Sequence, residues 1–188
     1  ITCGEGGMVV TSDRKITERC RNLRNMAFIE SKRFWHQEIG FNYRMTNMQA
    51  ALGLAQFEQI DELIKKRRRN AALYSALLSG VEGLTLPVER PDVKNVYWMY
   101  GILVGKDFGV SRNDLMKRLA QKGIETRTFF IPLHNQPFLG KKYRVSKERF
   151  PVAEDIARRG LYLPSGSGLK KEEIEYVCDC IKKIKGAV

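Results

Sequence analysis

The longest periodic stretch of the chain runs from Thr46 to Gly80, where apolar residues recur every three or four positions. That spacing predicts an amphipathic helix, because residues three and four apart share one helix face. Thr46 and Gln49 have the spacing of a capping box, in which each side chain bonds to the backbone N–H of the other residue. We expect a helix to begin after Thr46, and a pattern this long indicates either one bent helix or two helices in series.

Two shorter patterns precede that helix. Residues 6–13 place an apolar run between glycines and a turn, which predicts a short strand. Residues 14–26 carry apolar side chains at helical spacing and predict a helix. Residues 28–45 are rich in aromatic side chains and have no period, so we expect an irregular loop there. Long structured loops in compact proteins are often functional.

The composition changes after Gly80, where a segment with glycines and prolines and without a period begins, and we place a domain boundary there. Ser111 and Asp114 resemble a second capping box that opens a helix. The mixed order of the remaining elements predicts a small α+β domain over residues 81–188. These elements are strands at 96–104 and 124–131, helices at 111–123, 149–160 and 171–184, and a brief extended piece at 161–164.

The chain is strongly basic, with 33 lysines and arginines against 21 acidic residues and a formal net charge of +12. Part of the surplus lies in the run "KKRRR" at residues 65–69. Nucleic-acid binding is one interpretation; a solvated helix face, or a surface that attracts phosphorylated small molecules, is the other. No aromatic residues are interleaved with the run, as a single-strand binding groove would require. We therefore expect these five side chains to face solvent and to bind no nucleic acid.

The four cysteines and two histidines of the chain form no metal-binding pattern. Cys178 and Cys180 are two apart on a predicted helix, so their thiols point in different directions. We expect no metal site and four free thiols, as in a reducing cytoplasm. No apolar run approaches the roughly 20 residues that span a bilayer. With 43% hydrophobic and 29% charged residues, the composition is typical of a soluble globular protein.

Four stretches of the sequence occur in a recognisable order: "ITCGEGGMVVTSD", "GFNYRMTNMQAALGLAQ", "PLHNQP" and "FPVAEDIARRGLYLPSGSGL". Together they resemble the DegT/StrS family of pyridoxal phosphate (PLP)-dependent nucleotide-sugar aminotransferases, with the GDP-perosamine synthase type as the nearest branch. The resemblance covers essentially the whole chain. It implies the α/β fold of fold-type I PLP aminotransferases. Residues 1–80 would be the C-terminal end of the large PLP-binding domain, and residues 81–188 the small C-terminal domain.

The resemblance implies an activity for the complete protein. With PLP as cofactor, it would move an amino group from glutamate to a nucleoside-diphosphate 4-keto-6-deoxy sugar, as part of deoxyamino-sugar and polysaccharide biosynthesis. In the family the lysine that carries PLP lies two positions before the residue that matches Ile1. This chain would then lack the catalytic lysine and be inactive alone, either as a fragment or because a modified lysine interrupts the sequence. Two alternatives stay open: a related PLP-dependent sugar dehydratase with histidine in place of the lysine, and a basic nucleic-acid-binding domain.

The resemblance also implies site residues within "GFNYRM". Asn42 matches an asparagine that reaches the PLP phosphate of the neighbouring subunit, in a homodimer with shared active sites. An amide can donate to a phosphate oxygen without carrying a charge. Arg44 is a candidate for substrate binding, because a guanidinium fork suits a carboxylate or a phosphate. Without the resemblance, Asn42 is typical of a turn and Arg44 of a surface ion pair.

Both histidines are further candidates for substrate binding. His134 lies in "PLH", a segment that faces the sugar-nucleotide side of the cleft in the family. The alternative for His134 is a histidine that satisfies turn carbonyls. His36 lies in the aromatic-rich stretch and would help shape the substrate pocket, and packing is its alternative. Phe41 stands where the family commonly has tyrosine, so we expect no polar role at that position.

Overall fold

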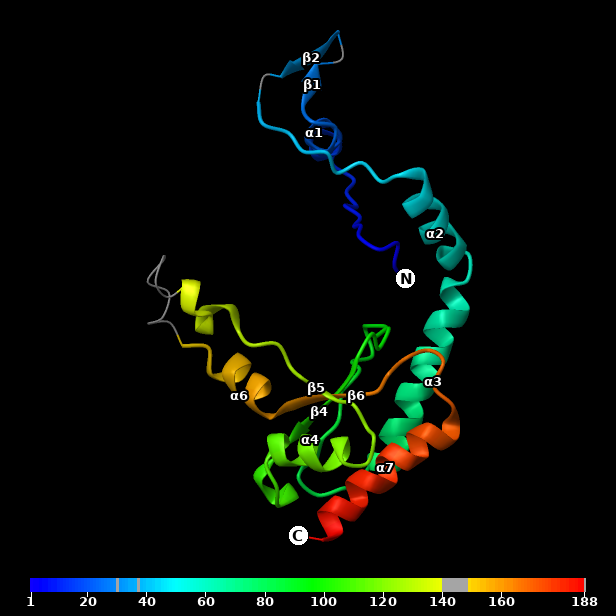
Figure 1. Cartoon of the computed structure of the whole chain (residues 1–188), viewed down its shortest axis with the longest axis vertical. Coiled ribbons are helices and arrows are strands. Elements are labelled where there is room, and N and C mark those ends of the chain that lie inside the picture. Colours follow the sequence, from blue (N-terminus) through cyan, green and yellow to red (C-terminus); the bar gives the residue numbers. More distant parts are fainter. Residues whose placement is uncertain (30, 37, 140–148, 188) are drawn as a thin grey trace. The chain divides into compact units, whose positions relative to one another are not determined.

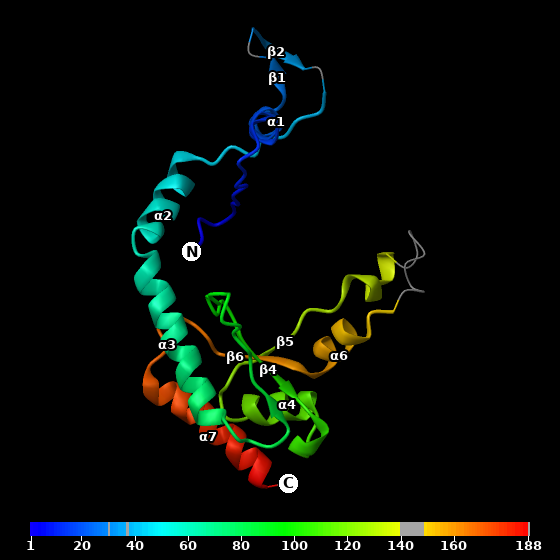
Figure 2. The ribbon, with the colours of Figure 1, turned by 180° about the vertical axis from the view of Figure 1, so that it is seen from behind.

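The computed structural model describes residues 1–29, 31–36, 38–139 and 149–187. It contains two compact units, Ile1–Ile60 and Asp61–Val188, and Figures 1 and 2 draw the ribbon from two sides. The boundary predicted after Gly80 separates the domains of the complete protein rather than these two compact units. It stays a prediction.

In its described residues, the first unit has two helices and one hairpin with irregular segments between them. Asp13 begins the first helix, because its Oδ1 accepts from the backbone N–H of Lys15 at 2.7 Å and of Ile16 at 3.2 Å. The helix predicted at 14–26 is therefore confirmed, with an earlier end. The elements are α1 (Arg14–Arg24), an antiparallel pair of β1 (Phe28–Ile29) and β2 (Lys32–His36), and α2 (Asn47–Phe57).

Two predictions for the first unit are wrong. The stretch 28–45 is not irregular throughout, because the β1–β2 hairpin occupies part of it; Glu30 and Gln37 of this stretch lie outside the described residues. Residues 8–10, expected in a strand, have exposed side chains and no strand partner in the part of the chain that the structure describes. A strand needs a neighbour for its backbone N–H and C=O groups, and a local apolar pattern cannot supply that neighbour.

The long helical pattern forms two helices in series. The first is α2, which ends at Phe57, and the second is α3 (Ile60–Leu78). The capping box of α2 is confirmed in both directions. The Gln49 N–H donates to Thr46 Oγ1 at 3.2 Å, and Gln49 Oε1 accepts from the Thr46 N–H at 3.0 Å. The start of α2 is thus fixed by local chemistry.

An antiparallel sheet in the order β3-β4-β6-β5 runs through the second unit. Strand β6 lies between β4 and β5 and is almost entirely buried. The sequence indicates only a brief extended piece there, and the structure makes it a central strand. The four strands are β3 (Leu84–Thr85), β4 (Tyr100–Val104), β5 (Arg127–Thr128) and β6 (Gly160–Leu163).

Helices pack with this sheet around one apolar core. They are α4 (Arg112–Ala120), α6 (Pro151–Arg159) and α7 (Lys171–Gly186), with the short 3₁₀ helices η1 (Lys106–Phe108) and η2 (Leu133–Asn135). Side chains of α3, α4, α7, β4 and β6 form the centre of the core, among them Tyr74, Leu78, Ile102, Leu115, Leu119, Leu161, Ile174 and Ile181. The cap predicted for α4 is present, because Ser111 Oγ accepts from the Asp114 N–H at 3.1 Å.

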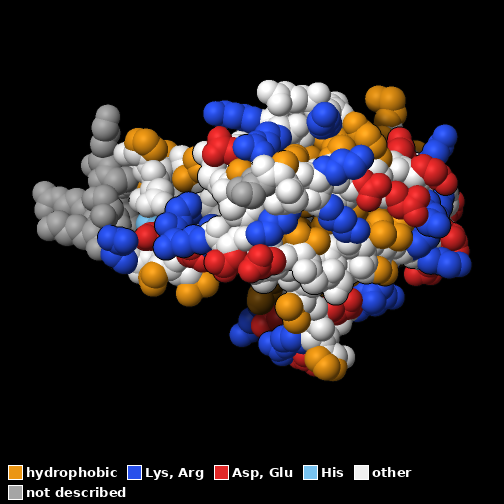
Figure 3. Space-filling model, turned by 90° about the horizontal axis from the view of Figure 1, so that it is seen from below, with side chains coloured by type: hydrophobic (Ala, Val, Ile, Leu, Met, Phe, Trp, Pro, Cys, Tyr) orange, Lys and Arg blue, Asp and Glu red, His pale blue; other side chains and the backbone are white. Residues whose placement is uncertain are grey.

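The basic run at residues 65–69 faces solvent only in part. Lys65, Lys66 and Arg69 are exposed as predicted, whereas the prediction is wrong for Arg67 and Arg68, which are half-buried. Arg67 Nη1 instead donates to two backbone carbonyls, Trp98 O at 2.8 Å and Ser165 O at 3.1 Å. On the face drawn in Figure 3, basic side chains are interspersed with acidic ones rather than gathered in one continuous patch. Part of the basic surplus therefore holds loops together.

Arg68 belongs to a hydrogen-bonded network around Glu89. Its Nη1 donates to Glu89 Oε1 at 2.7 Å and to the Asn95 carbonyl at 2.6 Å. Glu89 also accepts from the Asn95 N–H at 3.0 Å and from the Tyr97 hydroxyl at 3.2 Å. The bond from Arg68 is the main reason that the pKa of Glu89 lies below its usual range. The network holds Tyr97 at a φ of 46°, which is unusual for a residue other than glycine.

The two halves of the basic run should respond differently to the loss of charge. We expect Arg68→Gln to lower the midpoint of thermal unfolding by about 3 °C or more, because it leaves Glu89 and the Asn95 carbonyl with fewer partners. The double variant Lys65→Gln/Lys66→Gln should shift that midpoint by about 1 °C or less, since both side chains are exposed. Thermal scans of the complete protein measure both. Equal shifts would show that Arg68 is no more than a surface charge.

Asp155 in α6 is held between two arginines of the same helix. Arg159 Nε donates to Asp155 Oδ2 at 2.9 Å, and Arg158 Nη2 donates to Asp155 Oδ1 at 2.6 Å. These bonds lower the pKa of Asp155 to about 2, and the bond from Arg159 has the larger effect. An unperturbed aspartate titrates near about 3.9.

The stability conferred by Asp155 should depend on acid pH. Because its folded-state pKa is lower than its unfolded-state pKa, the stabilisation is complete above about pH 4 and is lost as the pH falls toward about 2. We expect Asp155→Asn to flatten the fall of the thermal midpoint between these pH values. Asp179→Asn, at an exposed position of α7, is the matched control. Parallel pH profiles for the two variants would contradict the prediction.

Candidate functional site

The segment that contains Asn42 is fixed by the end of helix α1. The last carbonyls of a helix lack partners within the helix. Two of them accept here: Leu23 O from the Phe41 N–H at 2.7 Å, and Arg24 O from the Tyr43 N–H at 3.0 Å. The rings of Phe41 and Tyr43 stack with centroids 5.1 Å apart. Asn42 is thereby held between two anchored neighbours.

A cavity of about 1220 Å³ lies beside this segment, within the first unit. Its walls come from three parts of the chain: the glycine turn with the extended residues after it, one face of α1, and the segment that leads into α2. The lining residues include Glu5, Gly6, Gly7, Thr17, Arg21, Arg24, Asn42, Tyr43, Arg44 and Gln49. Two of the sequence motifs, "GEGG" and "GFNYRM", therefore meet at one cavity.

The polar groups of this cavity suit an anion. Arg44 Nε donates to Asn42 Oδ1 at 3.1 Å, so the amide nitrogen of Asn42 is the end that can donate to a ligand. The lining side chains include three arginines, at positions 21, 24 and 44, and one carboxylate, Glu5. Guanidinium groups bind phosphate and carboxylate oxygens with two parallel N–H donors.

The glycine turn approaches its neighbours too closely for a larger residue. A Cβ atom at Gly6 would lie 2.6 Å from Cys3 Sγ and 3.3 Å from Met45 Cε. Glycine at this position leaves the backbone of the turn in direct contact with the segment before α2. The turn and that segment are therefore packed against each other, which the sequence pattern alone did not indicate.

Two of the four predicted site residues, Asn42 and Arg44, lie together at this cavity. His36 is not among the described residues that line it. His36 Nδ1 lies 2.7 Å from Met26 O, and its ring packs on Phe28 with centroids 4.9 Å apart. These contacts support the packing alternative for His36. A role of His36 in substrate binding stays a prediction.

His134 lies in the second unit, on η2. Its Nε2 is 3.2 Å from Glu154 Oε1, and its ring lies beside Phe150 with centroids 4.8 Å apart. Glu154 also accepts from the Phe150 N–H at 3.2 Å, and this bond is the first cause of a lowered pKa at Glu154. His134 thus connects η2 to the start of α6, and its predicted role at the sugar nucleotide is untested.

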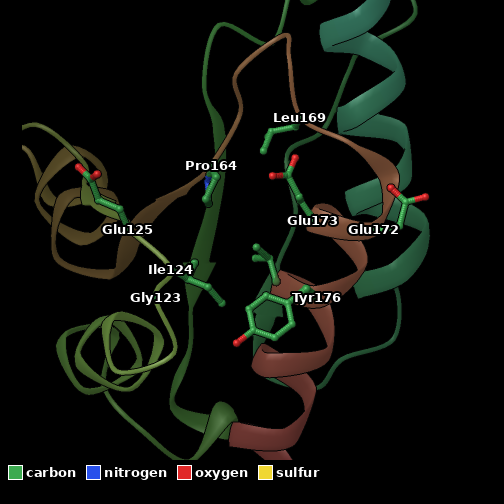
Figure 4. A pocket seen from close by; sticks show the side chains of 9 residues that line it. Gly123, Ile124, Glu125, Pro164, Leu169, Glu172, Glu173 and Tyr176 are labelled. Carbon is green, nitrogen blue, oxygen red and sulfur yellow. The ribbon is translucent and has the colours of Figure 1, made fainter.

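A second, smaller cavity of about 360 Å³ lies in the second unit. Figure 4 shows Ile124, Leu169 and Tyr176 around its centre, with the carboxylates of Glu125 and Glu172 toward the edges. Most of its lining surface is apolar, and the Glu173 carboxylate lies near its centre, beside Leu169 (Figure 4).

Two further findings concern metals and membranes. In the described ranges, no group of three or more histidine, cysteine, aspartate or glutamate residues could hold a metal ion. Within the same ranges, no helix has both the length and the apolar character needed to cross a bilayer.

Sequence reasoning missed the part that Gln49 takes in the cavity. Its spacing from Thr46 predicted only a helix cap, yet its amide lines the cavity as well. The side-chain type at position 49 could have indicated this second role. Glutamate would cap the helix equally well, whereas glutamine also carries an N–H donor.

Comparison with known proteins gives one family over nearly the whole chain. Residues 1–182 match the family model of the DegT/DnrJ/EryC1/StrS aminotransferase family. The GDP-perosamine synthase of Escherichia coli O157:H7 is 40% identical over 183 residues, which are 97% of this chain and 48% of that protein. EpsN of Bacillus subtilis, which carries the name of a pyridoxal phosphate-dependent aminotransferase, is 36% identical over 174 residues, 92% of this chain and 44% of that protein. The chain thus spans about half the length of the curated relatives it matches.

Solved structures give the same result. DesV of S. venezuelae, solved in complex with a ketimine intermediate, superimposes with a TM-score of 0.84 at 30% identity, over 95% of this chain and 46% of that one. This match confirms the predicted α/β class of the sugar aminotransferases. The four motifs, the family model and the solved fold agree, and the chain belongs to the DegT/DnrJ/EryC1/StrS aminotransferase family.

Proposed function

We propose that the complete protein is a PLP-dependent aminotransferase that moves an amino group from glutamate to a 4-keto-6-deoxy sugar carried on a nucleoside diphosphate. The observation that carries this proposal is the cavity of the first unit, where the motifs "GEGG" and "GFNYRM" supply adjoining walls. The family membership supports the reaction class. The name of the 40% identical relative, a GDP-perosamine synthase, supports a sugar nucleotide as substrate.

The residues of this cavity fit the phosphate end of PLP. The amide of Asn42 offers an N–H donor, and Arg44 supplies a positive charge beside it. Gly6, where a Cβ would meet Cys3 and Met45, keeps the turn close to these donors. When bound, PLP supplies the electron sink that amino-group transfer requires. Asn42 would orient the phosphate, and Arg44 would fix the Asn42 amide by donating to its oxygen.

Other parts of the proposal rest on the resemblance. The position of the lysine that carries PLP, two residues before the residue that matches Ile1, is taken from the family pattern. The proposal includes a homodimer in which Asn42 reaches the cofactor of the partner subunit, and a cytoplasmic enzyme. His36 and His134 remain candidates on the sugar side. The matching family and the relative EpsN are named as aminotransferases, so the dehydratase and the nucleic-acid-binding alternatives are not favoured.

The complete protein, loaded with PLP, tests this function directly. Nucleoside-diphosphate 4-keto-6-deoxy sugars with guanine or thymine bases are supplied with glutamate, and the products are separated and weighed by mass spectrometry. An amino sugar together with 2-oxoglutarate supports the proposal. A dehydrated sugar with no consumption of glutamate would favour the dehydratase. Binding of DNA or RNA that weakens steeply with salt, without turnover of any sugar, would favour the nucleic-acid-binding alternative.

A further inference from the structure

Two glutamines of α2 hold the N-terminal segment by its backbone. Gln56 Oε1 accepts from the Thr2 N–H at 3.0 Å, and Gln56 Nε2 donates back to the Thr2 carbonyl. Seven residues before Gln56, Gln49 Nε2 donates to the Glu5 carbonyl at 3.2 Å. Positions seven apart lie two turns apart on one helix face. One face of α2 therefore binds residues 2–5, which have no regular secondary structure of their own.

Gln49 takes part in a second set of bonds at the same time. Its Oε1 accepts from the Thr46 N–H at 3.0 Å and from the Thr46 hydroxyl at 3.1 Å. The amide thus uses its acceptor end at the start of α2 and its donor end on the glycine turn. Glu5 and Gln49 both line the cavity of the first unit, as do Asn42 and Arg44 just before Thr46. A single side chain joins the two walls that carry the sequence motifs.

We propose that Gln49 and Gln56 are positioning residues that set the distance between the glycine turn and the Asn42–Arg44 segment, with Gln49 as the direct link. The inference rests on the proposed function of this cavity. Neither glutamine needs to touch the substrate. Each acts through the backbone that it holds, and Gln49 does so only as long as its side chain has both a donor and an acceptor.

Glutamate at position 49 separates the two roles of the side chain. A glutamate at this position still caps the helix, but it cannot donate to the Glu5 carbonyl and repels that oxygen. We expect Gln49→Glu in the complete protein to raise the apparent dissociation constant for PLP and to lower kcat/KM, each about tenfold. The thermal midpoint should stay within about 2 °C of wild type. Gln56→Met, which removes the clamp on Thr2 without adding charge, should act in the same direction.

Gln59→Glu is the matched control, because the bond that Gln59 Nε2 makes in the described part of the chain is local, to Ala55 O at 3.2 Å. It adds the same charge and should change kcat/KM less than about twofold. The visible circular dichroism of bound PLP, measured at saturating PLP concentration, reports how the cofactor is oriented in the site. A residue that only stabilises the fold would leave this signal unchanged. We expect this band to change in Gln49→Glu and to stay unchanged in Gln59→Glu. Equal PLP affinity, kcat/KM and dichroism in the two variants, with an active wild type, would overturn the inference.

Failure of the proposed function would look different. A wild-type protein that binds no PLP contradicts that function, and hydrogen exchange of the amides of residues 5–7 then decides the inference by itself. Faster exchange in Gln49→Glu than in Gln59→Glu supports the link between the two walls. Equal exchange in the two variants overturns it.

Discussion

Replacing Asn42 with aspartate is expected to weaken PLP binding by the complete protein about 100-fold, equivalent to about 2.7 kcal/mol. Asn42 Oδ1 already accepts from Arg44, so the amide nitrogen is the end that can donate to a ligand. Aspartate has no donor there, and its charge would also pair with Arg44 and neutralise it. Like charges a few ångströms apart repel by about 4 kcal/mol near a protein surface, so loss of the donor and repulsion of the phosphate act together.

Asn47→Asp is the matched control for this prediction. It makes the same chemical change five positions later, at the first residue of α2, outside the cavity lining. A negative charge at a helix N-terminus is favourable, so folding is preserved. Titration with PLP, followed by absorbance, measures both variants. An Asn42→Asp protein that binds PLP as tightly as Asn47→Asp would remove Asn42 from the site.

The same variant tests whether Asn42 acts in the partner subunit. A mixed dimer is prepared from one Asn42→Asp subunit and one subunit that lacks the PLP-carrying lysine. If Asn42 serves the neighbouring site, the mixed dimer contains one fully intact site and regains about half of the wild-type activity. If Asn42 serves its own subunit, no site in the mixed dimer is intact and activity stays low.

Gly83→Ala is expected to be the most destabilising single-methyl change in the second unit, costing about 3 kcal/mol or more. Gly83 has a φ of 79°, where an L side chain is strained. A Cβ atom there would also lie 2.0 Å from the Phe108 backbone nitrogen and 2.5 Å from the Asp107 carbonyl carbon. Both neighbours are backbone atoms, so the 3₁₀ helix η1 must shift for the methyl to fit.

Gly80→Ala is the control that separates backbone strain at positive φ from the steric clash of the added methyl group. Gly80 has nearly the same φ, 77°, and nothing lies within 4 Å of the position that a Cβ atom would take there. Its substitution should cost about 1–2 kcal/mol, the strain alone. Urea unfolding of the complete protein compares the two variants. If both lose the same stability, the close approach of Gly83 to η1 is relieved by small backbone movements.

Local sequence patterns correctly predicted the helices whose start is fixed by residues close together in the sequence. The Thr46–Gln49 capping box and the helix that begins at Asn47 depend on neighbours in the sequence, and both are confirmed. The pattern allowed one bent helix or two in series, and the structure has two, because α2 ends at Phe57 and α3 begins at Ile60.

Elements with distant causes were harder to predict. Strand β6 has four residues, and its central place comes from pairing with β4 and β5, about 60 and 30 positions earlier in the chain. The role of Arg67 was missed for the same reason, since its carbonyl partners lie 31 and 98 positions away. Spacing within a helix says nothing about such partners.

In the candidate site, too, contacts between residues close in sequence could be predicted and contacts between distant residues could not. The motif "GFNYRM" indicated Asn42 and Arg44, and the structure brings both to one cavity. The bond from Gln49 to the Glu5 carbonyl joins positions 44 apart, which no local pattern could reveal. The place of His36 in the aromatic-rich stretch suggested a role in the substrate pocket, whereas its contact with the Met26 carbonyl depends on how the β1–β2 hairpin folds.

The arginine contacts of α3 change how the isoelectric point of this chain, about 9.7, should be interpreted. Arg67 and Arg68 each use one nitrogen, Nη1, for two acceptors, so this nitrogen is committed to loops before any ligand arrives. Exchange of Arg68 for lysine would leave the isoelectric point almost unchanged, yet it would require a strongly hydrated ammonium on a flexible stem to reach the same two acceptors. Lys65 and Lys66 are exposed, so their exchange for arginine should change the stability little. Bulk charge is therefore a poor guide to what this protein binds, because adjacent positive charges on one helix differ in whether they bond to loop carbonyls or face solvent.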